Sequence, residues 1–158
     1  MATDASNDAS NLAVLFADVS GSTRLYETVG DALALATIGQ CLELVGAACA
    51  GHGGRVVKTI GDEVMAVFPT ADQAATAAAE MQARISELDP VGGARLAIRV
   101  GFHVGPAIEV SGDVFGDSVN VAARMTALAK GQQVILSAET AAALSPLLQR
   151  ARARDRLC

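Results

Sequence analysis

Short apolar runs alternate along this chain with longer stretches in which apolar residues recur at helical spacing. The short runs predict six strands, over residues 12–17, 55–60, 64–68, 96–104, 107–110 and 134–136. The longer stretches predict helices over residues 23–51 with a break near Gly30 and Asp31, and over residues 71–88, 117–129 and 138–148. Tight turns are predicted at residues 61–63 and at Gly105-Pro106.

This order of elements favours an α+β fold of the ferredoxin-like (split βαβ) type, with an antiparallel sheet and helices mainly on one face. Residues 12–158 are expected to form one domain, after a disordered lead-in or linker over residues 1–11. Strands 12–17 and 64–68 are apolar on both faces, so both faces need cover. The terminal helix or loops would provide it in one interpretation. We favour the other, a homodimer packed through the sheet face.

Composition narrows the possible partners. The chain is 51% hydrophobic, 18% charged and 3% aromatic, with a net charge of −5, which argues against a nucleic-acid surface. Cys41 and Cys49 lie in an apolar helical pattern, and with Cys158 they lack metal-type spacing, so we expect no disulfide and a cytoplasmic location. No signal peptide is visible, and no apolar run reaches the roughly 18 residues that a membrane span needs. No membrane contact is therefore expected.

Two carboxylates follow apolar strands directly. Asp18 comes after strand 12–17, and Asp62 comes after strand 55–60. A carboxylate at such a place is costly unless it is solvated or binds a cation, and oxygen ligands suit a hard divalent ion. Asp62 could also be an ordinary turn residue, but no turn chemistry requires acid at Asp18. Together they predict a two-metal site of the kind used in phosphoryl transfer.

Two further segments near these aspartates are candidates for substrate contact. The small residues from Val19 through Gly21, Ser22 and Thr23 lead into a helix, whose free N–H groups suit a phosphate; Ser22 or Thr23 could instead simply cap the helix. Lys58, on the same strand face as Val56 and Ile60, is either a snorkelling surface lysine or a hydrogen-bond donor toward a purine.

The remaining candidates surround the predicted helix 117–129. Asp117 is expected to cap this helix. Asn120 and Arg124 are four residues apart and share one face, where they could hold a triphosphate, although Arg124 could also form a structural ion pair. Asp113, in the preceding loop, could accept from an exocyclic amine. His103 reads as a core histidine, and neither it nor His52 is given a catalytic role.

These motifs, in this order and spacing over residues 12–145, resemble the class III nucleotidyl cyclases, specifically the bacterial adenylate cyclase catalytic domain. The resemblance implies Mg²⁺ or Mn²⁺ as cofactor, two ions per site, bound by Asp18, Asp62 and the carbonyl of Val19. It implies that Lys58 and Asp113 select adenine. Guanylate cyclases typically carry a Glu and a Cys at these two positions.

The resemblance also implies ATP as substrate and a site shared between the subunits of a homodimer. One chain would supply Asp18 and Asp62. The other would supply Lys58, Asp113 and the transition-state residues Asn120 and Arg124.

Two differences from the family stand out. Ser22 replaces a frequent aromatic residue, and the C-terminal hairpin with its phosphate-binding lysine is missing. Either the chain is a domain excised from a longer protein, which could carry a regulatory domain, or its terminus differs from that of the family. A non-catalytic dimerisation or regulatory module is the alternative function. A diguanylate cyclase is a weaker one, because residues 60–64 only faintly match its Gly-Gly-Asp-Glu-Phe hairpin and Lys58 and Arg124 would stay unexplained.

Overall fold

A computed structural model describes residues 9–155 of the chain, and the predicted α+β class is confirmed. The strands are β1 (Ala9–Val19), β2 (Arg55–Ile60), β3 (Glu63–Phe68), β4 (Ile98–Val110), β5 (Asp113–Phe115) and β6 (Val134–Leu136). The helices are α1 (Ser22–Val29), α2 (Asp31–Gly51), α3 (Ala71–Ser86), α4 (Asp117–Leu128), α5 (Ala138–Ala143) and α6 (Pro146–Asp155).

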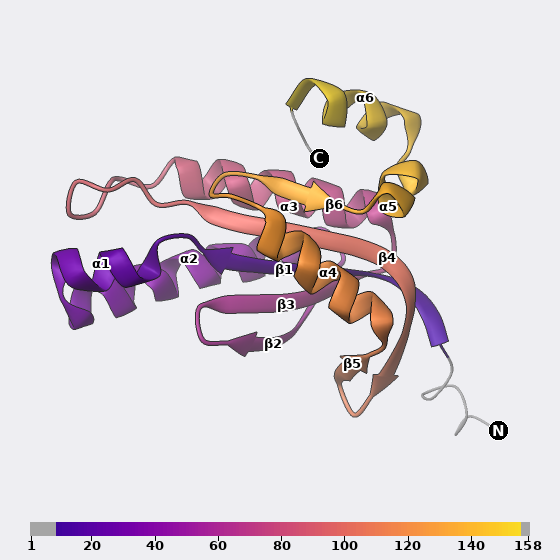
Figure 1. The fold of residues 1–158 in the computed structure, drawn as a ribbon, viewed down its shortest axis with the longest axis horizontal. Helices are drawn as coiled ribbons and strands as arrows, with labels where there is room; N and C mark the ends of the chain where they lie inside the picture. Colours follow the sequence, from indigo (N-terminus) through magenta and orange to yellow (C-terminus); the bar gives the residue numbers. More distant parts are fainter. Residues whose placement is uncertain (1–8, 156–158) are drawn as a thin grey trace.

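The strands form one sheet in the order β2-β3-β1-β4-β5, and β6 pairs with β4 beyond this path. All pairings are antiparallel except that of β6 with β4. Strand β1 is central and pairs with β4 along its whole length (Figure 1). Strands β1, β2 and β5, which carry Asp18, Lys58 and Asp113, therefore belong to one sheet.

Both faces of the sheet are covered by helices of the same chain. Helices α2 and α3 lie on one face, as predicted, over Leu15 and Ala17 of β1 (Figure 1). Helix α4 crosses the other face, where Val14 and Phe16 pack with Ala122.

This second layer corrects the reason given above for a homodimer. The side chains of Val14, Phe16, Met65 and Val67 are at most 5% exposed in a single chain. Their burial comes from α4 and the β4–β5 hairpin, so the two-sided apolarity of these strands needs no second subunit.

Two strand boundaries differ from the prediction. Strand β1 begins at Ala9, so residues 9–11 belong to it and not to the lead-in, whose residues 1–8 lie outside the described part of the chain. Strand β4 runs unbroken through Gly105-Pro106, where a turn was predicted. Proline is tolerated because β6 ends its pairing at Phe102 and β5 begins its own at Ile108, so no ladder partner faces Pro106 on that side.

The predicted side-chain caps are absent at three helix starts. Helices α1, α2 and α4 follow Gly21, Gly30 and Gly116, whose φ angles are 76°, 85° and 133°. No side chain makes a cap hydrogen bond there, so Asp31 and Asp117 are first helical residues and not caps. Glycine takes these positions because a positive φ strains other residues.

The predicted last helix is divided into α5 and α6. Pro146 splits the predicted last helix, because proline favours a first helical position and disfavours an interior one. Helix α2 is long and apolar enough to cross a membrane by length and composition only. It is nevertheless a core helix here, with Cys41 and Cys49 fully buried and free, as predicted for small apolar side chains. Cys158 lies outside the described residues.

Close approach of α4 to the sheet depends on Gly101. A Cβ atom at this position would lie 2.1 Å from the backbone nitrogen of Thr126. We expect Gly101→Ala to lower the free energy of unfolding by about 1–3 kcal/mol, because α4 must move outward. Urea unfolding measures the change.

Gly39→Ala is the matched control, because a Cβ atom there meets nothing within 4 Å and the residue lies inside α2. This control should gain up to about 1 kcal/mol from helix propensity. Equal stability of the Gly101→Ala variant and the wild type would contradict the close packing of α4.

Candidate functional site

Strand register places Asp18 between a like charge and an opposite charge. Asp18 lies directly opposite Glu63 on β3 and opposite Arg99 on β4. Arg99 donates from Nε to Oδ1 of Asp18 at 2.9 Å and from Nη2 to Oδ2 at 2.5 Å. Asp18 is only 9% exposed, and this two-pronged ion pair offsets part of the cost of burying its charge.

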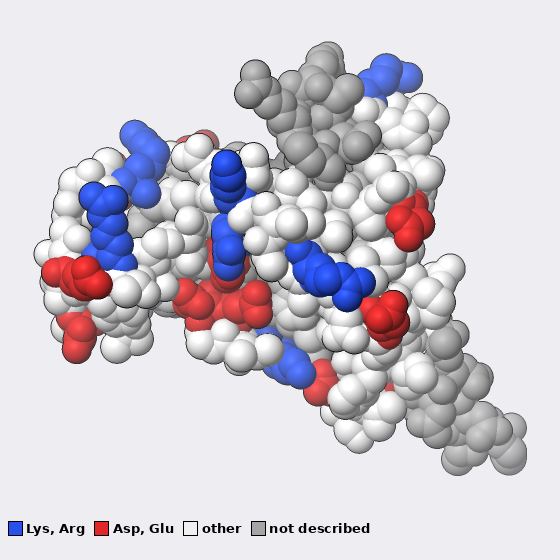
Figure 2. All heavy atoms as spheres, viewed as in Figure 1, with Lys and Arg blue, Asp and Glu red and all other residues white. Residues whose placement is uncertain are grey.

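The second expected metal ligand lies beside the first. Asp62 sits in the two-residue turn between β2 and β3, after Gly61, whose φ is 60°. The backbone nitrogen of Val19 donates to the carbonyl of Asp62 at 3.3 Å. The turn is thereby tied to the end of β1, and Asp18, Val19 and Asp62 are neighbours, as the sequence predicted. On the face of the molecule that Figure 2 shows, acidic side chains gather in the middle, with basic side chains close by.

The charges in this cluster shift the affinities of its members for protons. Burial raises the pKa of Glu63, and the negative charges of Asp18 and Asp62 raise it further, while Arg99 opposes the shift. The hydrogen bonds to Asp18 raise the pKa of Arg99, so its guanidinium stays charged. The cluster therefore holds more negative charge than Arg99 alone neutralises.

Such a surplus of carboxylate oxygens fits a hard divalent cation. Asp18, Asp62 and the carbonyl of Val19 are the oxygen donors that the sequence predicted, and the carboxylate of Glu63 lies opposite Asp18. Within residues 9–155, no three His, Cys, Asp or Glu side chains converge as a metal-binding group. A cation here would need further oxygens, which a bound triphosphate could supply, and Arg99 would have to share or release Asp18.

The start of α1 offers backbone donors next to this cluster. The amides of Val19 and Ser20 already donate to Asp62 and Ala97. Of the segment expected to contact phosphate, the first turn of α1, with Ser22 and Thr23, therefore remains. A hollow of about 350 Å³ opens beside Gly21, lined in part by Arg24 and Arg95.

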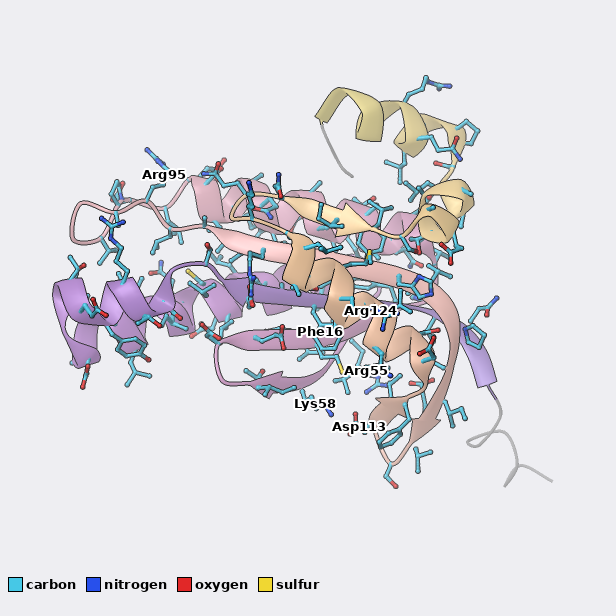
Figure 3. The ribbon with its side chains drawn as sticks, viewed as in Figure 1. Phe16, Arg55, Lys58, Arg95, Asp113 and Arg124 are labelled. Atoms are coloured by element: carbon cyan, nitrogen blue, oxygen red, sulfur yellow. The ribbon has the colours of Figure 1, made fainter. Side chains whose placement is uncertain are left out.

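The expected purine-contacting pair is also brought together. Nζ of Lys58 donates to Oδ2 of Asp113 at 3.1 Å, across from β2 to the start of β5 (Figure 3). The pKa of Asp113 is lowered, first by the Val114 backbone N–H and then by Lys58. Both side chains remain partly exposed, at 44% and 33%, so a ligand can reach them.

One detail of Lys58 differs from expectation. A β-bulge lies between Val56 and Lys58, and Val56 pairs with Ala66 whereas Lys58 pairs with Met65. Directly opposite residues share a sheet face, so Lys58 and Val56 point to opposite faces. Ile60, opposite Glu63, shares the face of Lys58 as predicted.

Asn120 and Arg124 lie on the outer side of α4, away from the sheet. The residues of α4 that face the sheet are Ser118, Ala122 and Thr126. Asn120 and Arg124 lie on the opposite side of the helix and are exposed; Arg124 is labelled in Figure 3. Among the described residues, neither makes an ion pair or side-chain hydrogen bond, so the structural ion pair considered for Arg124 is not formed there.

His103 is a core histidine, as predicted. His103 is buried, with its Nδ1 2.6 Å from Oγ of Ser137, and His52 pairs with Glu80 at 2.9 Å. Sequence reasoning missed Arg99 and Glu63. The available signal was a lone charge within or beside an apolar strand, but only the register reveals that both lie opposite Asp18.

Comparisons with known proteins all find similarity to nucleotide cyclases. Residues 5–157 match the family described as adenylate and guanylate cyclase catalytic domain. An adenylate cyclase of Streptomyces coelicolor is 38% identical over 126 residues, which cover 79% of this chain and 32% of that protein. The chain thus spans about a third of the length of this curated relative.

Two solved structures share the fold. The adenylate/guanylate cyclase/hydrolase of Silicibacter pomeroyi is 34% identical, with a TM-score of 0.72, covering 92% of this chain and 82% of that one. The monomeric guanylyl cyclase domain of the RhoGC fusion protein of Blastocladiella emersonii is 25% identical, with a TM-score of 0.75, covering 84% and 85%.

The charge cluster predicts a pH-dependent effect of Glu63→Gln. Because the pKa of Glu63 is raised, folding is favoured while Glu63 is protonated, and this contribution is lost as pH rises through the raised pKa. Glutamine removes that loss, so the variant should be more stable than the wild type at pH 8. The difference should shrink as pH falls toward 5. Urea unfolding at both pH values measures it, and a variant less stable at pH 8 would contradict the arrangement.

Proposed function

This chain belongs to the family of adenylate and guanylate cyclase catalytic domains, and on that premise we propose that it converts ATP to 3′,5′-cyclic AMP and pyrophosphate. The observation that carries the choice of nucleotide is the exposed Lys58–Asp113 pair. It offers one donor and one acceptor to the edge of a purine, at positions where a guanylate cyclase typically carries other residues.

The proposed reaction is an in-line displacement at phosphorus. The 3′-oxygen of the ribose forms a bond to the α-phosphorus, the bond from that phosphorus to the bridging oxygen breaks, and pyrophosphate leaves. The hydroxyl proton passes to solvent. No side chain of the described residues is proposed as a general base, so the protein contributes mainly by positioning and by electrostatic stabilisation.

Asp18, Asp62 and the carbonyl of Val19 are proposed to bind Mg²⁺ or Mn²⁺. The support is the surplus negative charge of the cluster and the oxygen character of its donors. Bound there, two such ions would lower the pKa of the 3′-hydroxyl and neutralise the triphosphate. Backbone amides at the start of α1, near Gly21, Ser22 and Thr23, would donate to phosphate oxygens.

Lys58 and Asp113 are proposed to read adenine. Lys58 would donate to N1, and Asp113 would accept from the amino group at position 6. Guanine presents a donor at N1 and an acceptor at position 6. With the pair held in place, the donor Lys58 would face the N1 donor and the acceptor Asp113 would face the acceptor at position 6, so neither hydrogen bond could form. Once a bound base covers the two side chains, groups left unpaired in this way discriminate strongly between substrates.

Asn120 and Arg124 are proposed to act in trans, in a homodimer with two equivalent sites. Arg124 would neutralise charge that develops on the α-phosphoryl oxygens, and Asn120 would orient the ribose. The support is that both are exposed on the outer side of α4, and that neither contacts the Asp18 cluster within residues 9–155. One subunit would then supply Asp18 and Asp62, and the other Lys58, Asp113, Asn120 and Arg124.

Mixing two inactive variants tests the shared site. Asp62→Ala lacks a metal ligand, and the double variant Lys58→Ala with Arg124→Ala lacks the opposite half. Each alone should make no cyclic AMP. In an equal mixture half of the dimers are mixed, and each has one intact site, so about a quarter of the wild-type activity should return.

The matched control mixes Asp62→Ala with Asp18→Ala, whose defects lie in the same half and cannot complement. Absence of recovery in the first mixture, with mixed dimers verified by differential tagging, would contradict the trans arrangement.

Product analysis tests the substrate. With Mn²⁺ or Mg²⁺, the protein should form cyclic AMP from ATP, and cyclic GMP from GTP at least about a hundredfold less efficiently in kcat/KM. Selective formation of cyclic GMP would overturn the roles given to Lys58 and Asp113. No turnover of either nucleotide would instead favour the alternative of a non-catalytic dimerisation or regulatory module.

A further inference from the structure

Arg55 joins β2 to the hairpin that carries Asp113. Its Nη1 donates to the carbonyl of Gly112 at 3.0 Å, and its Nη2 donates to Oε1 of Glu109 at 2.5 Å. Glu109 is on β4, and Gly112 directly precedes Asp113 in the turn between β4 and β5. One guanidinium thus contacts both the strand and the turn of this hairpin. Arg55 and Asp113 are labelled in Figure 3.

The β-bulge in β2 gives Arg55 and Lys58 a common direction. In a regular strand, residues three apart point to opposite faces. Here Val57 is the extra residue, so Arg55 pairs with Val67 and Lys58 with Met65. Val67 and Met65 both belong to the apolar cluster under α4. The bulge therefore aims both cations at the hairpin.

Side-chain contacts, and no direct backbone pairing, set the distance between β2 and the β4–β5 hairpin. Strands β2 and β5 are at opposite ends of the hydrogen-bonded order, so no ladder joins them. The hairpin itself is short, with a two-residue turn in which Ser111 and Gly112 have φ angles of 53° and 82°. Arg55–Glu109, Arg55–Gly112 and Lys58–Asp113 are the polar contacts that tie β2 to this hairpin within the described residues.

We propose that Arg55 is a positioning residue for purine selection, which it serves by holding the β4–β5 hairpin so that Lys58 and Asp113 meet fixed atoms of the base. This inference rests on the proposed adenylate cyclase function. Arg55 itself is not assigned a contact with the nucleotide.

The positions of Lys58 and Asp113 matter because these two residue types alone do not distinguish adenine from guanine. A lysine and an aspartate offer one donor and one acceptor. Set against N1 and the 6-amino group, they match adenine. Moved so that Lys58 reaches position 6 and Asp113 reaches N1, the same two groups match guanine. Selectivity for adenine therefore needs a clamp that prevents this exchange, and Arg55 is placed to provide it.

A purely structural role of Arg55 would show in the stability of the protein and not in its choice of nucleotide. The Arg55–Glu109 pair is about half exposed, with side chains 45% and 46% accessible. Exposed ion pairs contribute little to stability. Loss of Arg55 should accordingly leave thermal unfolding nearly unchanged while it alters the ratio of kcat/KM for ATP to that for GTP.

The experiment measures that ratio in Arg55→Met, with Arg84→Met as matched control. Arg84 forms an ion pair with Glu80 at 3.1 Å on α3 and is 48% exposed, so the same substitution is made away from the hairpin. We expect Arg55→Met to lower the ATP/GTP ratio by about tenfold, and Arg84→Met to leave it unchanged. Arg55→Lys keeps the charge but not the two-pronged geometry, so it should fall between Arg55→Met and the wild type.

The outcomes separate cleanly. If Arg55→Met lowers kcat/KM for both nucleotides equally, the positioning role is overturned although the proposed function stands. If the wild type forms no cyclic AMP, the proposed function fails, and this inference fails with it. If Arg55→Met does not fold, Glu109→Gln replaces it, because this variant keeps Arg55 and removes only the charge of its partner. A ratio unchanged in Glu109→Gln would then overturn the proposal.

Discussion

The fixed register of the central strand β1 is the constraint on which the rest of this structure depends. Strand β1 pairs with β3 on one side and with β4 on the other, and its buried residues alternate between two apolar layers. A slip by one residue would exchange the layers and bury Asp18 under α2 and α3. With the observed register, Asp18 instead emerges at the strand end beside Glu63, Asp62 and Arg99, where a compact acidic cluster forms.

That cluster balances opposing charge effects. Three carboxylates lie near one another at the sheet end, and burial, together with the charges of Asp18 and Asp62, raises the pKa of Glu63. Arg99 compensates Asp18 but leaves a net negative charge. A site that accumulates such charge and remains next to the free start of α1 suits a cation together with a polyanionic substrate. In the single chain the guanidinium of Arg99 occupies both oxygens of Asp18, so substrate binding and release of Asp18 are coupled in the proposed mechanism.

The second face of the sheet connects the two halves of the proposed site. Helix α4 lies close to β4 because residue 101 is glycine, and it presents Asn120 and Arg124 outward. The same face carries Lys58 on β2 and, across the apolar cluster, the hairpin with Asp113. The outward direction of Asn120 and Arg124 separates them from the Asp18 cluster of their own chain. The proposal that a second subunit completes the site rests on that separation and not on exposed apolar strands.

The sequence by itself determined the α+β class, most elements, the hairpin at Asp62 and the candidate site residues. Local patterns suffice for these, because apolar periodicity, glycine and proline act over a few neighbouring residues. Only the tertiary structure decided the facing of Asp18, Glu63 and Arg99, because strand register depends on partners far apart in the chain. It also decided the unbroken course of β4 through Pro106 and the cover of the second face by α4, since both depend on neighbouring elements. The bulge at Val57 belongs to the same class, and it alone brings Arg55 and Lys58 to one face.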